Sequence, residues 1–350
     1  MRPFFPRRHS AWPDCRRGSI IGREAAFSLI EILVTVAVVV VVMVAVLEVV
    51  TSVERSWKAA AADSFADAEN AFSTLTQTLA SATLESYQDY ADSNGTFRTT
   101  TTSTFTPDHL ARRSDLDFVC GPTTGTNGLL ANSGRTSSGC GVFFLSPQGY
   151  TQTDANLGMD RLFNAMGYFV EFGNDTDQPT FFPTSTQRWR WRLKQVCQPT
   201  ESLQIFTLTN SAGWIQQLVS SEATTPTLAD NIIAFVVLPV RAASDNGTAL
   251  SSDYRYDSRD ATNPLTRNQL PARLRIAVMA IDEASAQILA AKNGTNPPAL
   301  VDSGLFQKAP QLDADIASLD NSLTAQKISH RLFEREILLT SSAWTNTLSQ

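Results

Sequence analysis

The clearest pattern in the sequence is an almost uninterrupted apolar stretch near its beginning. From Phe27 to Leu47 the chain reads "FSLIEILVTVAVVVVVMVAVL", with a single charged residue, Glu31. As an α-helix, this stretch would extend roughly 31 Å, which matches the hydrocarbon core of a bilayer. The pattern therefore predicts a transmembrane helix over residues 27–47.

The residues that follow keep a helical pattern but become amphipathic. No glycine or proline occurs between Glu48 and residue 90, and apolar residues recur at alternating steps of three and four. This spacing predicts a helical stem over residues 48–90, continuous with the membrane helix. Its apolar stripe is too short for a coiled coil, so we expect it to pack on the protein's own sheet. The stripe consists of Phe65, Ala68, Phe72, Leu75, Leu79 and Ala82.

Short runs rich in β-branched and aromatic residues follow, separated by clusters of glycine, proline, asparagine and aspartate. Such runs are typical of antiparallel strands. They read LDFVC, GVFFLS, GYFVEF, RWRWRLKQV, LQIFTLT, NIIAFVVLPV and RLRIAVMAI. A last helical pattern extends from Asp313 to Glu336, and the polar stretches near 243–264 and 292–304 indicate surface loops. The sequence thus predicts an α+β fold, in which a long N-terminal helix packs on a mainly antiparallel β-sheet head over residues 91–350.

The run RWRWRLKQV alternates basic with apolar residues through Lys194. This alternation predicts one buried and one solvent-exposed face, and such residues could also form a nucleic-acid platform. The chain has 28 basic and 34 acidic residues, of which residues 1–26 hold six and two, so the remainder carries a formal charge of −10. An acidic body argues against nucleic acid as a partner.

The first 26 residues form a basic leader directly before the apolar stretch. Basic flanks of a membrane helix stay in the cytoplasm. We therefore expect a single-pass protein of the inner membrane with a cytoplasmic N-terminus and its head on the other side, in the periplasm or in a surface filament. A cleaved secretory signal would have a shorter apolar stretch, and a plain signal anchor is the alternative.

Of the four cysteines, Cys15 lies in the leader and the others in the head. If the head lies outside the cytoplasm, Cys120 and Cys140 could close a disulfide across a loop rich in glycine, serine and threonine. Cys197 would then be left over. The alternatives are three buried free thiols, or a pairing that includes Cys197.

Enzyme signatures are poor in this sequence. His109 and His330 have no histidine or cysteine neighbours at metal-ligand spacing, and no nucleotide-binding or nucleophile motif appears. The segment NDTDQ at 174–178 offers two carboxylates for calcium but too few ligands for a known loop. We expect no enzymatic activity, no cofactor and no metal site.

The stretch AFSLIEILVTVAVVVVV resembles the processing and assembly signature of type IV pilins and type II secretion pseudopilins. The resemblance implies that a prepilin peptidase cuts between Ala26 and Phe27 and that the new amine of Phe27 is methylated. It also implies that Glu31, at the fifth mature position, is the assembly carboxylate. The family usually has glycine before the cut, where this chain has Ala26.

A wider likeness covers most of the 350 residues. The segments AFSTLTQTLASATLESYQDY, LADNIIAFVVLPV and LPARLRIAVMAIDEASA are similar to the Verru_Chthon cassette protein C family, whose members are pseudopilin-like. The resemblance implies a minor pseudopilin-like subunit of a type IV pilus or type II secretion-like assembly. Its partners would be the prepilin peptidase, sister pseudopilin-like subunits and the inner membrane.

Glu31 separates two functional hypotheses. A charge inside a membrane span costs on the order of 3 kcal/mol, and pairing with the amine of Phe27 on a neighbouring subunit would offset that cost. In a solitary membrane-anchored binding protein or adhesin, which is the alternative function, the carboxylate would only be a liability. A further alternative is that the side chain of Glu31 reaches the membrane interface and has no role in assembly.

Overall fold

The computed structural model describes residues 29–63, 65–99, 104–174, 188–208, 211–220, 225–302 and 304–345, without the side chains of 29, 31 and 52–63. The chain is α+β, with an apolar N-terminal helix and antiparallel sheets. It divides into two compact units, Met1–Ala59 and Ala60–Gln350. The head belongs to the second unit.

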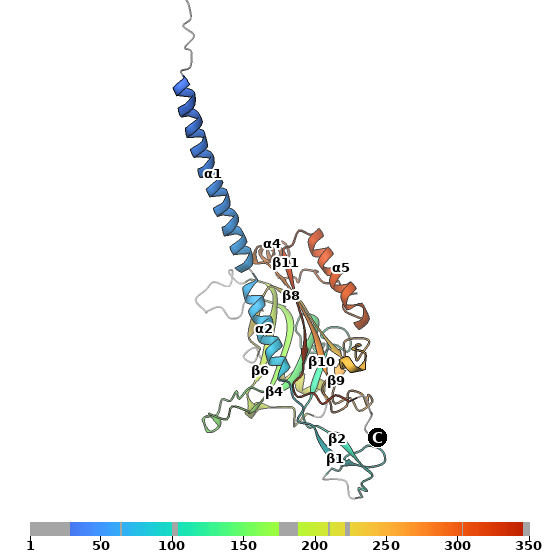
Figure 1. Cartoon of the computed structure of the whole chain (residues 1–350). Coiled ribbons are helices and arrows are strands. Elements are labelled where there is room, and N and C mark those ends of the chain that lie inside the picture. The colour runs from blue at the N-terminus through green and yellow to red at the C-terminus, as the bar shows by residue number, and fades with distance from the viewer. Residues whose placement is uncertain are drawn as a thin grey trace, which may run out of the picture. The chain divides into compact units, whose positions relative to one another are not determined.

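Two helices occupy the region for which the sequence predicts a single membrane helix and stem (Figure 1). Helix α1 spans Leu29–Asp63 and α2 spans Ala66–Ala80. All six positions of the predicted apolar stripe are buried, none more than 8 % exposed, as their spacing predicts. The predicted extension of the stem to residue 90 is wrong, since residues 87–91 form a strand; the chain leaves the helix at Ser81, and Glu85 has a φ of 42°.

Helix α2 and the residue that follows it contact the C-terminal strand of the head and one strand of its larger sheet. The ring of Phe72 lies 5.9 Å from that of Phe333, and the backbone carbonyl of Ala80 accepts a hydrogen bond of 3.2 Å from the backbone of Thr340. On the other side, Ser81 and Ser146 share a hydrogen bond of 2.6 Å. One stripe residue, Phe72, thus contacts the C-terminal strand, and the end of α2 is hydrogen-bonded to Thr340 and, through Ser81, to the larger sheet.

The larger sheet has six antiparallel strands in the order β7-β6-β5-β4-β3-β9. Four of them match predicted apolar runs, because alternating or continuous β-branched and aromatic residues suit a buried pleated surface. The strands are β3 (Phe118–Pro122), β4 (Ser137–Pro147), β5 (Phe163–Gly173), β6 (Arg190–Gln198), β7 (Thr227–Asp230) and β9 (Tyr256–Asp257).

A second sheet has three antiparallel strands in the order β11-β10-β8. The strands are β8 (Ile232–Val240), β10 (Arg273–Ile281) and β11 (His330–Leu338). Every residue of β8 is buried, because β8 pairs with β10 and also lies against β4 and β6 of the larger sheet. The two sheets therefore share one hydrophobic core.

Strands β7 and β8 are one extended segment that bends at Asn231. This residue has a left-handed φ of 63°, a conformation that asparagine tolerates better than most residues. Its backbone N–H donates to Trp191 of the six-stranded sheet (2.8 Å), and its carbonyl accepts from Ile281 of the three-stranded sheet (2.9 Å). The hydrogen-bond ladders of both sheets thus meet at a single residue.

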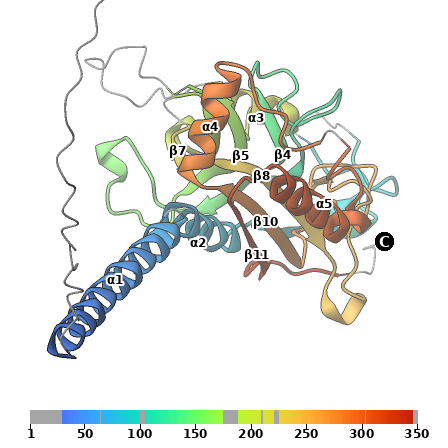
Figure 2. The same cartoon turned by 90° about the horizontal axis from the view of Figure 1, so that it is seen from above.

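The remaining described helices lie around the strands. Figure 2 shows α5 over β10, and Asp313 of α5 forms an ion pair with Arg275 of that strand. The helices are α3 (Ser211–Val219), α4 (Glu283–Asn293) and α5 (Leu312–Ala325), and short 3-10 helices lie at Asp154–Asn156, Thr200–Ser202, Ala243–Asp245 and Ala309–Gln311.

A separate hairpin forms a two-stranded sheet of its own. Its strands are β1 (Tyr87–Ala91) and β2 (His109–Arg113), paired so that Tyr90 lies opposite Leu110. Figure 1 shows this hairpin at one end of the head, near the C-terminus of the chain. Residues 92–108 connect the two strands.

Three predictions about the head are wrong. The helical pattern predicted to Glu336 ends at Ala325, because Lys327 has a φ of 57° and the chain then pairs with β10 as strand β11. The run LQIFTLT forms no strand over its described residues 203–208. The guanidinium of Arg259 binds the backbone carbonyls of Ile205 and Leu208 instead.

The polar stretch near 243–264, predicted as a surface loop, includes the short strand β9, in which Tyr256 is buried.

Candidate functional site

The predicted processing site lies outside the described residues. Ala26 and Phe27 precede the start of the described chain, as does Cys15. The backbone of Glu31 belongs to the first turn of α1, and its side chain is not described. Cleavage at Ala26–Phe27, methylation of Phe27 and the assembly role of Glu31 therefore stay predictions.

Helix α1 carries the apolar surface that follows Glu31. The 20 residues Ile32–Thr51 are long and apolar enough to cross a membrane. Every large apolar side chain between Ile32 and Val50 is at least 48 % exposed. The helix thus offers a largely apolar cylinder to its surroundings, which water would solvate poorly and lipid or neighbouring apolar helices would solvate well. This finding agrees with a single N-terminal membrane anchor.

The two cysteines proposed as a disulfide are free thiols in the structure. Cys120 of β3 lies opposite Val142, and Cys140 of β4 lies opposite Pro122, so the two cysteines occupy diagonal positions of one ladder. Diagonal residues are about 7–8 Å apart, beyond the usual Cα separation of a disulfide. This register disfavours the possible Cys120–Cys140 disulfide and agrees with the alternative of buried free thiols.

Burial makes these thiols unreactive. It raises the pKa of Cys140 to about 12 and that of Cys120 well above its usual range. Cys197 lies on β6 opposite Met166, and partial burial raises its pKa to about 11. Thiolate is the nucleophilic form, so none of the three is poised for chemistry near neutral pH.

The two histidines of the head have local polar partners. Nδ1 of His109 lies 3.1 Å from Asp108, and Nε2 of His330 lies 2.8 Å from Asp320. Over the described residues, no group of three or more histidine, cysteine, aspartate or glutamate side chains is placed to hold a metal ion. Of the NDTDQ segment only Asn174 is described, and its backbone carbonyl accepts a hydrogen bond from Arg192.

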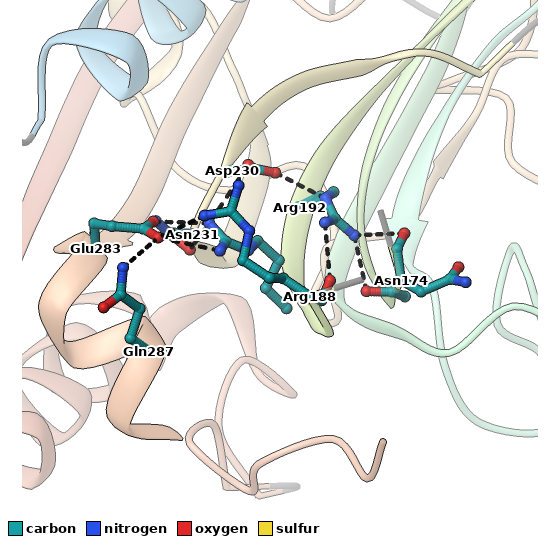
Figure 3. A network of polar contacts seen from close by, with 9 residues as sticks. Asn174, Arg188, Arg192, Asp230, Asn231, Glu283 and Gln287 are labelled. Atoms are coloured by element: carbon teal, nitrogen blue, oxygen red, sulfur yellow. Dashed lines mark hydrogen bonds and ion pairs between the residues drawn. The ribbon is translucent and has the colours of Figure 1, made fainter. Parts of the chain in front are cut away.

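A network of buried arginines joins the two sheets, as Figure 3 shows. The guanidinium of Arg190 in β6 donates to both carboxylate oxygens of Glu283, at 2.7 and 3.1 Å, and Nε of Arg192 donates to Asp230 at 2.8 Å. Asn231 donates to the same Glu283 carboxylate at 2.8 Å. Glu283 opens helix α4, shortly after β10 of the three-stranded sheet. The network therefore links β6, the β7–β8 bend and α4.

The predicted solvent-exposed face of RWRWRLKQV is buried except at its first residue, Arg188, which is exposed. Arg190, Arg192 and Lys194 are 6 %, 3 % and 6 % exposed. The prediction is wrong because polar groups from other strands and helices cover these charges. Burial alone would raise the pKa of Glu283, but hydrogen bonds from Arg190 and Asn231 outweigh it and lower that pKa to about 2.

The contacts of this network indicate a structural role. Both arginine guanidinium groups are engaged by carboxylates or backbone carbonyls. The cavity beside Arg190 and Trp191 measures about 10 Å³, which holds one water at most. We conclude that the network fixes the geometry of the head.

Sequence reasoning did not find Glu283 as the partner of Arg190. The signal present in the sequence is a helix start, because Asp282 caps α4 by accepting a hydrogen bond from the backbone of Ser285. A carboxylate at the first position of a helix is favourable in itself. Nothing local indicates that it pairs with a strand 93 residues away.

Comparison with known proteins adds no family to this description. No protein-family model, curated protein or solved structure matches the chain.

Proposed function

We propose that this chain is a minor pseudopilin-like subunit of a type IV pilus or type II secretion-like assembly. The observation that carries the proposal is the exposed apolar surface of Ile32–Thr51, which follows directly on Glu31 and on the signature AFSLIE. A helix of this kind requires lipid or other apolar helices around it. The likeness to the Verru_Chthon cassette protein C family supports the same proposal.

Glu31 gives the proposal its mechanism. After cleavage, Phe27 would carry a new amine near the membrane surface, and the carboxylate of Glu31 on a neighbouring subunit would pair with it. Pairing offsets the cost of a charge in the span and fixes the axial register of packed helices. The prepilin peptidase and sister pseudopilin-like subunits are the partners that this mechanism needs.

The head would act as the part that recognises neighbours and not as an enzyme. Polar insertions such as 292–304 favour a position at the tip of a filament over one in its shaft, because repeated subunits leave less room for insertions. In this proposal the leader stays in the cytoplasm, and the head is exported across the inner membrane.

The proposal is tested by Glu31→Leu, with crosslinking to sister pseudopilins as the measurement. Removing a charge from the span should favour membrane insertion by on the order of 3 kcal/mol, so membrane association should persist. Crosslinked complex should fall sharply, because the amine of Phe27 loses its partner. Mass spectrometry of the extracted protein should show Phe27 as the methylated N-terminus in both forms.

A matched control is Thr35→Leu, which changes a polar residue of the same helix without removing a charge, and should leave the crosslinked complex unchanged. Wild-type levels of complex from Glu31→Leu, or an intact arginine-rich leader in cells with an active prepilin peptidase, would contradict the proposal. Either result would favour a solitary membrane-anchored binding protein or adhesin.

A further inference from the structure

A polar cavity lies at the base of the β1–β2 hairpin. The hairpin is tied to the loop before β10 by side-chain hydrogen bonds: Asn268 donates to the carbonyl of Arg112 at 2.8 Å, and the Arg112 guanidinium donates to Gln269. Asn268 and Gln269 are themselves buried. Between these groups is a cavity of about 110 Å³, whose lining includes Phe97, His109, Arg112 and Arg267.

The charged side chains that line this cavity are those of two arginines, Arg112 and Arg267. His109 also contributes to the lining, with its Nδ1 3.1 Å from Asp108, and no aspartate or glutamate lines the cavity itself. Neighbouring arginines outside the cavity are compensated, since Arg113 lies 2.7 Å from Asp89. Within the described chain, neither Arg112 nor Arg267 lies within ion-pair distance of a carboxylate.

Arg112 is a partly buried cation whose charge is not balanced by an acid. Burial lowers the pKa of its guanidinium, and Tyr256 offsets this only in part. A charged group removed from water without an opposite charge is unfavourable, and an anion in the cavity would relieve that cost. Arg112 thus favours an anionic occupant.

Arg267 is held in place before any ligand arrives. Its Nη2 donates to the carbonyl of Gly95 at 3.2 Å, and its guanidinium carbon lies 5.5 Å from the ring centre of Phe97. These contacts leave other N–H groups of the guanidinium free to bind a ligand. A pre-positioned guanidinium loses little conformational entropy on binding and suits the oxygens of a phosphate.

We propose that this cavity binds the phosphoryl group of a phosphate or phosphomonoester. Two arginines without acidic partners match a group that carries about two negative charges at neutral pH. A single water needs about 10–15 Å³ by the same measure, so a cavity of about 110 Å³ has room for one compact tetrahedral group. This site is independent of helix α1 and of the assembly proposal.

The test is isothermal titration of the detergent-solubilised full chain with inorganic phosphate at constant ionic strength. We expect saturable binding that sulfate competes away, and Arg267→Gln should weaken it by roughly tenfold or more. Arg112→Gln should do the same and provides a second variant should the first disturb folding. Arg161→Gln removes the same charge from an exposed position outside the cavity and should change affinity by less than about twofold.

Titration with glycerol 3-phosphate separates the two sources of the group. Binding as tight as that of inorganic phosphate would assign the site to phosphomonoesters such as lipid headgroups or sugar phosphates. Binding of inorganic phosphate alone would assign it to the free ion. Absence of saturable binding for both, or an equal loss in Arg161→Gln and the two cavity variants, would overturn the proposal.

Discussion

Arg190 is a buried cation whose charge is balanced by a carboxylate from a distant part of the chain. Its side chain is 6 % exposed, whereas that of Glu283 is 40 % exposed. The pair thus sits at the boundary between core and solvent, with the positive end inside. Removing the carboxylate would leave the guanidinium buried without its counter-charge, which is the costly way to break an ion pair.

We predict that Glu283→Gln lowers the free energy of unfolding by roughly 2 kcal/mol at pH 7, less than a fully buried pair because Glu283 is partly solvated. The pKa of Glu283 falls from its ordinary 4.5 to about 2 on folding. Its contribution is therefore complete above about pH 5 and is lost as the pH falls toward 2. Urea unfolding in detergent, followed by tryptophan fluorescence, measures both effects.

The exposed carboxylate of Asp160 provides the control for this prediction. Asp160→Asn should leave the unfolding free energy within about 0.5 kcal/mol of the wild type at each pH. A difference between wild type and Glu283→Gln that stays constant from pH 7 to pH 3 would mean that the Glu283 carboxylate does not stabilise the head through its charge.

At the residue scale, the sequence predicts which residues are charged but not which charges meet. Alternation in RWRWRLKQV correctly indicates a strand, but period two cannot distinguish a solvated face from a face covered by distant carboxylates. The same limit applies to the cysteines, because their separation in sequence says nothing about the register that sets Cys120 and Cys140 diagonally. The predictions for Glu31 and Phe27 do not have this limit, because both residues belong to one short segment of the sequence.

A close approach of the two sheets depends on a glycine in β4. Gly139 has a φ of 71°, and a Cβ at this position would lie 2.5 Å from the backbone oxygen of Phe235 in β8. The ladder between β4 and β5 shifts register here, between Ser138 and Gly141. A bulge without a side chain therefore lets the two strands touch through their backbones.

We predict that Gly139→Ala destabilises the head by on the order of 3 kcal/mol, because the methyl group meets backbone and the φ is unfavourable for alanine. Gly134 is a matched control, since its φ is 73° but a Cβ there would have no atom within 4 Å. Gly134→Ala should cost only about 1 kcal/mol, from the backbone alone. Equal midpoints of thermal unfolding for the two variants would refute the close contact as the cause.

Elements of the head are predictable where one periodicity is unambiguous. Strands β8 and β10 are long, mainly apolar runs that include valine and isoleucine, and the structure confirms both. The pattern that leads into β11 favours a helix instead, because Ile328 and Leu332 are four apart and continue the spacing of α5; in the strand, Leu332 is exposed and Phe333 is buried. A spacing of four places side chains on one face of a strand as well as on one face of a helix.

At the scale of the whole molecule, the charge distribution sets the expected topology. The basic leader precedes a span of 20 mainly apolar residues, and the remainder of the chain is acidic. We predict that a reporter active only outside the cytoplasm, fused after Gln350, is active, because the arginine flank keeps the N-terminus inside. Reporter activity is the measurement.

The matched control replaces the leader arginines with glutamine and keeps the span unchanged. This variant should lose part of the orientation bias and give a mixed population of fusions. Activity of a cytoplasm-only reporter after Gln350 in the unaltered chain would place the head in the cytoplasm. That result would rule out the exported head on which the assembly proposal depends.

The bend at Asn231 also determines how force is transmitted between the two sheets. Because one segment enters the six-stranded sheet as β7 and leaves in the three-stranded sheet as β8, covalent backbone connects the two layers without an intervening loop. Tension applied to either layer is therefore passed to the other through peptide bonds, not only through packed side chains. The arginine network contacts this crossing at Asp230 and at Asn231. Shear between the layers would strain these contacts together with the backbone, so we expect the head to bear load as one stiff body.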